Sequence, residues 1–272
     1  YLSLAADQYD INALKQLGYI YIDGLYISRD IKKTIYYFSQ AADQDDSEAQ
    51  FQLGLIYYNG QFISRDINKA IHYFQLAADL NDPRAQNLLG LIYYEGQYVS
   101  QDIDKAIYYY SLAANQGNQE AQLQLGNIYN DERYNMKDIN KAIHYYSFAA
   151  DQNNSIAQNK LCRIGYDIMN LVHDVKKAIH IFTFLADKNH VISQFMLGYI
   201  YSNIQFGFLD VKKSIHYYEL ASKQNHCDSQ LNLGIIYQNS LLIKPNAEKA
   251  IYYLELASKH NDSRAFYDLG VI

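Results

Sequence analysis

A strict 36-residue period is the feature that most constrains how this chain folds. Aspartate or asparagine recurs every 36 residues from residue 30 to residue 246, and Leu-Gly recurs in a fixed register from residue 17 to residue 269, with Cys162 replacing glycine once. A period of this length is typical of solenoids, in which each repeat buries its apolar face against its neighbours. We therefore expect one continuous repeat array rather than unrelated domains.

The period divides the sequence into seven full repeats and two partial ones. The full repeats are 11–46, 47–82, 83–118, 119–154, 155–190, 191–226 and 227–262, and the partial repeats are 1–10 and 263–272. Tyr1 aligns with Tyr37 and Ile272 aligns with Ile56, which places both ends inside a repeat. Because solenoids need polar capping repeats, we expect a piece of a longer array, with targeting or catalytic segments outside it.

Each repeat has the pattern of two amphipathic helices. In repeat 47–82 apolar residues recur at helical spacing along about 49–57 and again along about 67–78. Asp46 and Asp66 precede these two stretches as N-caps, and Asn59-Gly60 ends the first helix with a residue suited to positive φ. Equivalent caps precede the other first helices at Asp82, Asn118, Asn154 and Asp262.

The recurring residues resemble one known family. Ala49-Gln50, Leu53-Gly54, Ile56-Tyr57, Asn59-Gly60, Asp66, Lys69-Ala70-Ile71, Tyr73 and Ala77-Ala78 are similar to the Sel1-like repeat (SLR), a relative of the tetratricopeptide repeat. The resemblance implies an all-α fold, a right-handed α/α superhelical solenoid of helix-turn-helix repeats. It also implies a protein-interaction scaffold or adaptor that has no catalytic activity in most members.

Composition narrows the function classes. The formal charge of −6 argues against a nucleic-acid binder, and no apolar run approaches the roughly 18 residues of a membrane span. No sequence motif of a nucleotide, metal or nucleophile site is present, so we expect no enzyme activity, no cofactor and no metal. The only two cysteines, Cys162 and Cys227, occupy different repeat positions, which slightly favours an intracellular, cytoplasmic location and counts against the extracellular branch of similar repeats, in which paired cysteines bridge the helices.

Columns that vary between repeats are free to recognise a partner, whereas constant columns are required by stacking. One face of the first helix varies, and by resemblance to tetratricopeptide arrays it lines the concave groove. We expect it to bind a protein or peptide segment through Tyr19, Phe51, Leu55, Tyr58, Asn87, Leu91, Tyr94, Asn127, Arg163, Tyr166, Phe195 and Tyr199. The alternative is that Phe51, Leu55, Leu91 and Phe195 simply pack against the neighbouring first helix.

Two regular columns of the second helix have structural explanations. Histidine or tyrosine recurs at residues 36, 72, 108, 144, 180, 216 and 252, but side chains in stacked repeats lie roughly 10 Å apart and do not converge on one ion, whose ligands lie at ~2.1 Å. Lysine recurs at residues 33, 69, 105, 141, 177, 213 and 249. Its regularity favours pairing with a nearby carboxylate or a solvated edge over a ligand site.

Repeat 155–190 departs from the pattern. Cys162, Gly165 and Ile168 stand where repeat 47–82 has Gly54, Tyr57 and Gly60. From repeat 119–154 onward the turn glycine is also replaced, by Glu132, Ile168, Ile204 and Ser240. We expect a small buried thiol at Cys162, a surface structural role for Cys227, and a local change of superhelical curvature near 160–170.

Two function classes remain open from the sequence. The first is an adaptor whose groove binds a protein segment. The second is an accessory or regulatory array attached to an enzymatic or targeting domain outside these residues.

Overall fold

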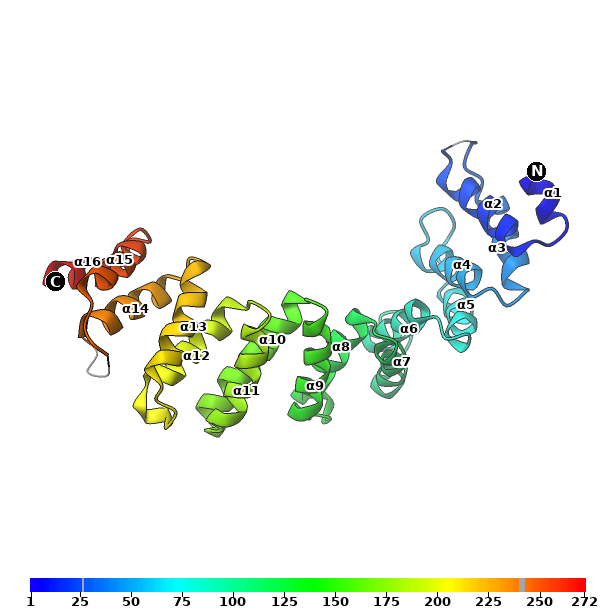
Figure 1. Ribbon diagram of the computed structural model, residues 1–272. Helices are drawn as coiled ribbons and strands as arrows, with labels where there is room; N and C mark the ends of the chain where they lie inside the picture. The colour runs from blue at the N-terminus through cyan, green and yellow to red at the C-terminus, as the bar shows by residue number, and fades with distance from the viewer. Residues whose placement is uncertain (26, 240–242) are drawn as a thin grey trace. The chain divides into compact units, whose positions relative to one another are not determined.

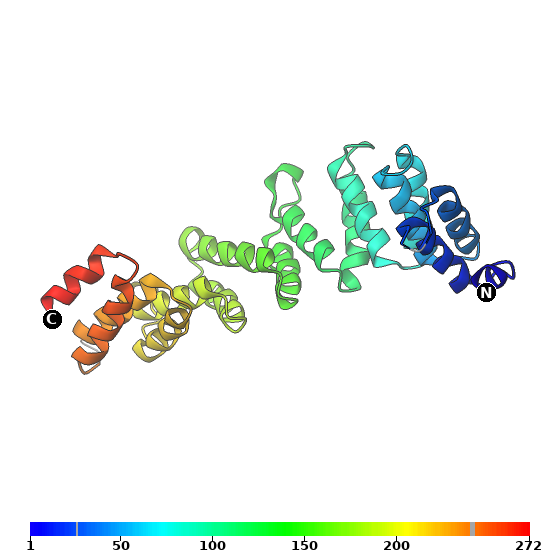
Figure 2. The same cartoon turned by 90° about the horizontal axis from the view of Figure 1, so that it is seen from above.

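The computed structural model describes residues 1–25, 27–239 and 243–272, and within them the chain is all helical, with no β-strand. The residues fall into two compact units, Tyr1–Phe148 and Ala149–Ile272. Inside each unit the helices follow one another as antiparallel pairs (Figures 1 and 2). The predicted helix pairs are confirmed.

In the first unit, the first helices of the repeats alternate with the second helices. Its elements are α1 (Leu2–Ala6), α2 (Ile11–Asp23), α3 (Ile31–Ala42), α4 (Ser47–Asn59), α5 (Ile67–Asp79), α6 (Pro83–Glu95), α7 (Ile103–Asn115), α8 (Gln119–Asn130), η1 (Glu132–Tyr134) and α9 (Ile139–Asp151), within which the boundary between the units falls.

The second unit continues the alternation and contains one irregular helical turn. Its elements are α10 (Ser155–Asp167), η2 (Ile168–Val172), α11 (Val175–Ala186), α12 (Val191–Ser202), η3 (Ile204–Phe206), α13 (Val211–Lys223), α14 (Cys227–Asn239), α15 (Ala247–Ser258) and α16 (Ser263–Val271). The η1 and η3 turns are 3₁₀ helices, whereas η2 is a π-helix.

Side-chain caps fix where the helices begin. Asp46 accepts from the amide of Ala49 at 2.8 Å, and Asp66 accepts from the amide of Lys69 at 3.1 Å. The caps predicted at Asp82, Asn118, Asn154 and Asp262 are also confirmed. Each cap satisfies an amide that has no partner within its own helix, so two polar columns, one before each helix of a repeat, set where the helices begin.

A buried glutamine donates a hydrogen bond to a backbone carbonyl at the end of the preceding helix. The side-chain amide of Gln50 donates to the carbonyl of Ala42 at 3.2 Å, at the end of α3. The same bond, at 3.2–3.5 Å, is made from Gln86, Gln122, Gln158, Gln194 and Gln230. The near-constant glutamine therefore ties α4, α6, α8, α10, α12 and α14 to the second helix of the preceding repeat.

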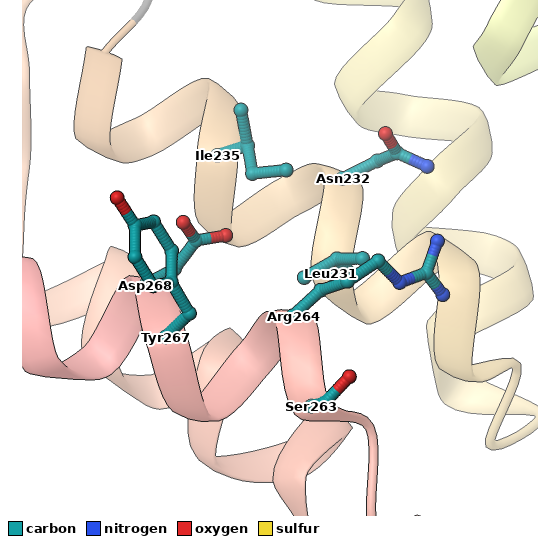
Figure 3. Close-up of a pocket in the computed structure, with 7 residues that line it drawn as sticks. All are labelled: Leu231, Asn232, Ile235, Ser263, Arg264, Tyr267 and Asp268. Atoms are coloured by element: carbon teal, nitrogen blue, oxygen red, sulfur yellow. The ribbon is translucent and has the colours of Figure 1, made fainter.

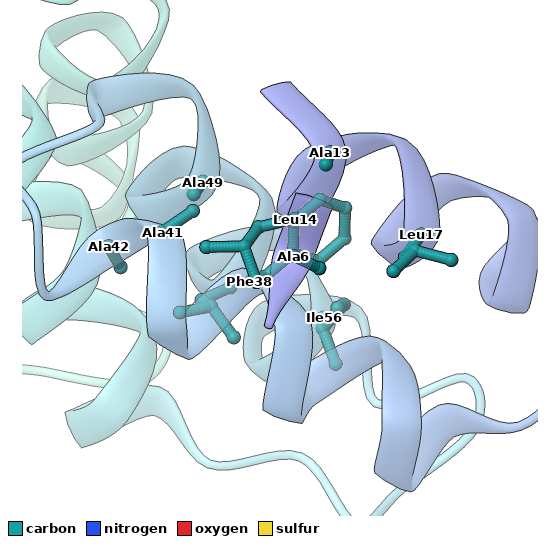
Figure 4. Packing of buried hydrophobic residues seen from close by; sticks show 10 residues of the cluster. Ala6, Ala13, Leu14, Leu17, Phe38, Ala41, Ala42, Ala49 and Ile56 are labelled. Carbon is teal, nitrogen blue, oxygen red and sulfur yellow. The ribbon is translucent and has the colours of Figure 1, made fainter. Parts of the chain in front are cut away.

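The two helices of a repeat meet where an aromatic ring lies on a glycine. A Cβ atom placed on Gly54 would lie 2.5 Å from two ring carbons of Phe74, and Gly18 stands in the same relation to Phe38. Phe38 packs with Leu14 and Leu17 in the core shown in Figure 4. No larger residue fits at this approach without repacking, which explains the periodic Leu-Gly pair.

A stack of two tyrosines and a lysine recurs in most repeats. Tyr57 stacks on Tyr73 with ring centroids 5.8 Å apart, and the Lys69 ammonium lies 5.0 Å from the Tyr57 ring. Five other repeats share this arrangement, with stacks at 5.7–6.0 Å and cations at 4.8–5.1 Å. The predicted carboxylate pairing is present at Lys69, Lys105 and Lys213, but the tyrosine beneath the lysine was not predicted.

Repeat 155–190 brings its two helices together at a different glycine. Phe182 occupies the ring position, and a Cβ on Gly165 would lie 3.0 Å from it, so the close approach is made one helical turn after the usual glycine. This shift leaves room for Cys162, which is buried as predicted. The first helix then runs on into η2, and His173 supplies the positive φ of 60° that Gly60 supplies in repeat 47–82. The curvature change near 160–170 stays a prediction.

The missing turn glycines are likewise replaced by residues farther along the chain. After Glu132 and Ile204, the left-handed residue comes three positions later, at Asn135 with φ 52° and Gly207 with φ 75°. A 3₁₀ turn fills the intervening positions. Ser240 lies outside the described residues.

The glycine contact predicts a large effect of one methyl group. Gly54→Ala should lower the free energy of unfolding by roughly 1–3 kcal/mol, because its Cβ overlaps the Phe74 ring. Gly270→Ala in α16 is the control, since nothing lies within 4 Å of its added Cβ, and it should be neutral or slightly stabilising. Urea unfolding of both variants measures the difference, and equal stabilities would contradict the proposed contact.

Candidate functional site

The predicted binding residues lie on one face of the first helices. We call this surface the first-helix face and define it by the positions equivalent to Phe51, Leu55 and Tyr58 of α4. Between repeats its members differ in size, charge and burial, and the structure divides them between the two units: Tyr19, Phe51, Leu55, Tyr58, Asn87, Leu91, Tyr94 and Asn127 lie in the first unit, and Arg163, Tyr166, Phe195 and Tyr199 lie in the second.

In the first unit several of these side chains are engaged within the fold. Phe51 is only 8% exposed and packs on Phe74, with the Arg84 guanidinium 4.4 Å above its ring. Leu55 and Leu91 are partly buried and pack against the core clusters of their repeats. Phe51 therefore packs within the fold, as the alternative interpretation of the sequence expects, and its main role is structural.

In the second unit the aromatic members of the face are more open. Tyr166 is 47% exposed and Tyr199 is 39% exposed. Phe195 stacks between Tyr199, at 6.5 Å, and the His226 ring, at 4.8 Å. Arg163 is exposed and its Nε lies 3.2 Å from the Asp167 carboxylate on the same helix. Tyr166 therefore offers apolar surface beside the Arg163 guanidinium, and Tyr199 offers a second exposed ring on α12.

Two hollows open between consecutive first helices of this unit. One, of about 390 Å³, lies between α10 and α12 and is lined by Asn159, Cys162, Arg163, Tyr166, His190, Ile192 and Met196. The other, of about 540 Å³, lies between α14 and α16, where Leu231 and Ile235 face Arg264 and Tyr267 (Figure 3). Asn159 and Leu231 occupy the position of Phe51, so a smaller side chain at this position accompanies each hollow.

An ion network links the first helices of the first unit. Arg84 Nη2 lies 2.7 Å from Glu48 on α4 and 2.6 Å from Asp82. Burial favours the protonated Glu48 carboxyl, but hydrogen bonds from Arg84, Gln52 and Tyr19 outweigh it and lower the Glu48 pKa to about 2. Arg264 repeats the arrangement in the second unit with Asp228 and Asp262. Ion pairs therefore stabilise the first-helix face in addition to its packing.

Two histidines that the sequence did not single out cap first helices. Nδ1 of His190 accepts from the amide of Ser193 at 3.3 Å, and its Nε2 lies 3.1 Å from Asn159 Oδ1. His226 caps α14 in the same way through Ser229. Burial lowers the pKa of both imidazoles. Their place in the cap column, 36 and 72 residues after Asn154, was the available signal.

Two equivalent tyrosines differ in whether their hydroxyl has a partner. Tyr146 Oη donates to Asn127 Oδ1 at 2.9 Å, so Asn127 is a partner of the core. Tyr110 is 1% exposed, and its hydroxyl has no hydrogen-bond partner, nor has Oδ1 of Asn87. Orphaned buried polar atoms are uncommon and call for an explanation.

The members of the histidine column are distributed along the array. His72, His144, His180 and His216 are exposed on four separate second helices, α5, α9, α11 and α13. Within the described part of the chain, no three His, Cys, Asp or Glu side chains are placed to share a metal ion. Cys227 is partly buried with Sγ 3.6 Å from Asp262, and burial raises the pKa of its thiol.

Comparison with known proteins identifies the repeat. The model of the Sel1 repeat matches residues 11–46, 47–82, 83–118, 119–154, 191–226 and 227–262. The chain belongs to the Sel1 repeat family. The unmatched stretch, 155–190, is the repeat in which Gly165 has taken over the ring contact and the tyrosine stack is absent, so the Sel1 fold persists there with a different residue pattern.

Solved structures agree with this assignment. A protective antigen of uropathogenic Escherichia coli strains that displays an SLR fold is 26% identical with a TM-score of 0.56, and it covers 99% of this chain and 66% of its own. A Sel1 repeat protein from Oxalobacter formigenes is 26% identical with a TM-score of 0.57, covering 99% and 78%. The predicted SLR solenoid is confirmed. A search of curated proteins finds no match.

The Sel1 assignment carries a general function. Sel1 repeat proteins are generally non-catalytic scaffolds that bind other proteins. Among the described residues, no helix has the length and apolarity needed to cross a membrane.

The histidine caps predict a pH-dependent stability in the second unit. The folded-state pKa of His190 lies below its unfolded value of about 6.5, so its contribution is present above that pH and is lost as the pH falls through the window below it. His190→Asn keeps the cap used at Asn118 and Asn154 and should flatten the dependence of unfolding free energy on pH below about 6.5. Exposed His216→Asn is the control, and an unchanged slope in His190→Asn would contradict the assignment.

The two tyrosine hydroxyls predict opposite responses to removal. Tyr146→Phe should cost about 1 kcal/mol, because it breaks the bond to Asn127. Tyr110→Phe should cost nothing or stabilise, because it removes a buried hydroxyl without a partner, and Phe38, Phe74 and Phe182 already occupy this position. Denaturant titration of the pair checks the expectation, and a loss of stability in Tyr110→Phe would reveal a missed partner.

Proposed function

We propose that the chain is a scaffold or adaptor whose first-helix face binds a segment of another protein. The observation that carries the proposal is the contrast between a constant part and a variable part of the repeats. Six of the seven full repeats carry the same Tyr-Tyr-Lys stack, whose members in repeat 47–82 are Tyr57, Tyr73 and Lys69. The first-helix face changes in every repeat within the same frame, as a recognition surface does.

The exposed aromatic residues of the second unit support this proposal most directly. Tyr166 and Tyr199 present large rings whose fixed geometry costs little conformational entropy on binding. The hollow between α10 and α12 lies beside Tyr166 and Arg163. Apolar anchors in a hollow with charged groups at the rim match the anatomy of a protein-binding hot spot.

The residues with internal partners contribute in a different way. Phe51 and Asn127 shape the face from below and are poor choices for truncation, because their loss removes packing or a hydrogen bond. Tyr58 and Tyr94 stand between these extremes, since each is partly buried and makes an edge contact with a tyrosine of the next loop, Tyr98 or Tyr134. The accessory-array alternative uses the same face and differs only in what lies outside these residues.

A display experiment with a matched control tests the proposal. Random peptides are selected against the chain, and the affinity of an enriched peptide is then measured by calorimetry. Tyr166→Ala with Tyr199→Ala should weaken binding by at least tenfold, the loss of about 1.4 kcal/mol or more expected of a hot spot. Tyr252→Ala on α15, which removes a 56% exposed tyrosine from the second-helix side, should leave it unchanged. Equal effects of both changes in folded proteins would refute the proposal.

A further inference from the structure

The hollow between α10 and α12, which we call the α10–α12 hollow, lies on the first-helix face of the second unit. Its volume is about 390 Å³, near the lower end of the roughly 300–1,000 Å³ found for small-ligand sites. A hollow of this size has room for a side chain. The residues that line it come from both helices and from the cap of α12: Asn159, Cys162, Arg163, Tyr166, His190, Ile192 and Met196.

The hydrophobic part of this lining reaches from the core to the surface. Cys162 and Met196 are 7% and 6% exposed, whereas Ile192 and Tyr166 are 41% and 47% exposed. The first pair therefore forms the deep end of the hollow, and the second pair stands where a partner approaches it. Apolar surface that is left open in this way gains free energy when an apolar group covers it.

The polar part of the lining is already satisfied within the fold. His190 Nε2 lies 3.1 Å from Asn159 Oδ1, and Arg163 Nε lies 3.2 Å from the Asp167 carboxylate. Burial lowers the pKa of His190, so its imidazole is neutral near pH 7. An occupant of the hollow is therefore not required to supply a charge or a hydrogen bond.

The next gap along the same unit shows what fills this space in a neighbouring repeat. Between α12 and α14, Phe195 stands at the position of Asn159, and its ring centroid lies 4.8 Å from the His226 ring. His226 caps α14 as His190 caps α12. The α10–α12 hollow thus keeps the cap histidine, and a small amide stands where the neighbouring repeat has a ring.

The first unit also places a ring at this position. Phe51 of α4 corresponds to Asn159 and packs on Phe74, with ring centroids 5.9 Å apart. The Arg84 guanidinium lies 4.4 Å from the Phe51 ring. A guanidinium also lines the α10–α12 hollow, at Arg163, so a ring bound there has a cation beside it.

We infer that the α10–α12 hollow binds a phenylalanine side chain presented by a partner protein segment. This inference rests on the proposed function and specifies the residue that anchors the partner. The bound ring takes the place that Phe195 takes one repeat later and gives His190 the aromatic neighbour that His226 has. The thioether of Met196 adds a contact that favours a ring, because sulfur interacts favourably with the edges of aromatic rings.

Phenylalanine suits this lining better than the other large side chains. A tyrosine hydroxyl needs a partner when it is buried, and the nearest polar groups, on Asn159 and His190, are bonded to each other. A lysine or arginine would bring positive charge beside Arg163, and like charges repel. Leucine would fill the space without the contacts that a ring makes with the guanidinium and the sulfur.

Peptides selected by display on the full chain test the identity of the occupant. The enriched peptides should share a phenylalanine at one position. Changing it to alanine should weaken binding roughly tenfold or more, because the change removes the buried anchor. Changing it to cyclohexylalanine, which has a similar shape without π-electrons, should weaken binding roughly two- to fivefold, because the contacts with Arg163 and Met196 are reduced.

A variant that fills the hollow from within tests the location. Asn159→Phe places a ring where Phe51 and Phe195 lie in other repeats, and it should weaken binding of the phenylalanine peptide roughly tenfold or more without lowering the melting temperature. The alanine form of the peptide should bind this variant and the unchanged chain equally. His180→Phe on α11 is the control, because it adds a ring at an exposed position where other repeats have tyrosine, and it should leave the affinity unchanged.

A second variant keeps the test decisive if Asn159→Phe does not fold. Ile192→Ala removes one wall of the hollow at a 41% exposed residue. It should weaken binding of the phenylalanine peptide roughly threefold, through the loss of apolar contact, and leave binding of the alanine peptide unchanged. Equal effects on the two peptides would overturn the inference.

Other outcomes separate this inference from the proposed function. Enriched peptides that share no phenylalanine, or that bind Asn159→Phe like the unchanged chain, overturn the inference, and the proposed function stands if Tyr166→Ala with Tyr199→Ala still weakens their binding.

If no peptide is enriched, the proposed function fails, and the hollow is titrated with N-acetyl-L-phenylalanine amide while the methyl resonances of the three methionines are followed. A saturable shift of Met196 that is absent at Met136 in the first unit and absent in Asn159→Phe would support the phenylalanine site alone. No shift of Met196 would overturn it as well.

Discussion

The contact between a glycine of the first helix and a ring of the second is the constraint on which most repeats depend, and in repeat 227–262 the side chain of Leu254 takes the place of the ring. A Cβ at Gly54, Gly90, Gly126 or Gly198 would lie 2.5–2.6 Å from a ring carbon, so the helix approach is set by the absence of one atom. Packed interiors do not absorb such an overlap without shifting backbone or rotamers. The glycine therefore recurs because these repeats need the same short distance between their two helices.

Once that distance is fixed, the remaining constant columns follow from it. The buried glutamines reach the carbonyl at the end of the preceding second helix, and the tyrosine pair stacks at nearly the same spacing in six repeats. Repeat 155–190 tests this dependence. There the ring meets Gly165 instead of residue 162, and the tyrosine stack is lost because Gly165 now stands where a tyrosine would. The shift of the glycine–ring contact is therefore accompanied by the loss of the tyrosine stack.

Much of this fold was predictable from the sequence because identical repeats must satisfy identical geometry. The helix pairs, the aspartate caps and the close-packing glycine all follow from residues that recur every 36 positions. The histidine caps at His190 and His226 were missed because histidine is an unusual cap and only the register marks it. The stack of Lys69 on Tyr57 was missed because periodicity shows that two columns are constant without showing that they touch.

The candidate site was less predictable for a physical reason. The sequence grouped Phe51, Asn87 and Phe195 as equivalent members of a variable face, but a side chain at this position either fills the space between two first helices or leaves it open. Whether that space is filled also depends on a second residue in the next repeat: the guanidinium of Arg84 on α6 covers the ring of Phe51 on α4.

The same pair of positions connects stability with recognition. Phe51 and Arg84 satisfy each other and the neighbouring acids, so that part of the face gains stability and presents little unmet hydrogen-bonding capacity. Asn87 and Glu120 occupy the same positions and leave an amide oxygen, a hydroxyl and a carboxylate without a cation. Natural proteins commonly give up stability at sites that bind, so this variation between equivalent positions connects the stability of a repeat with the surface that it offers to a partner.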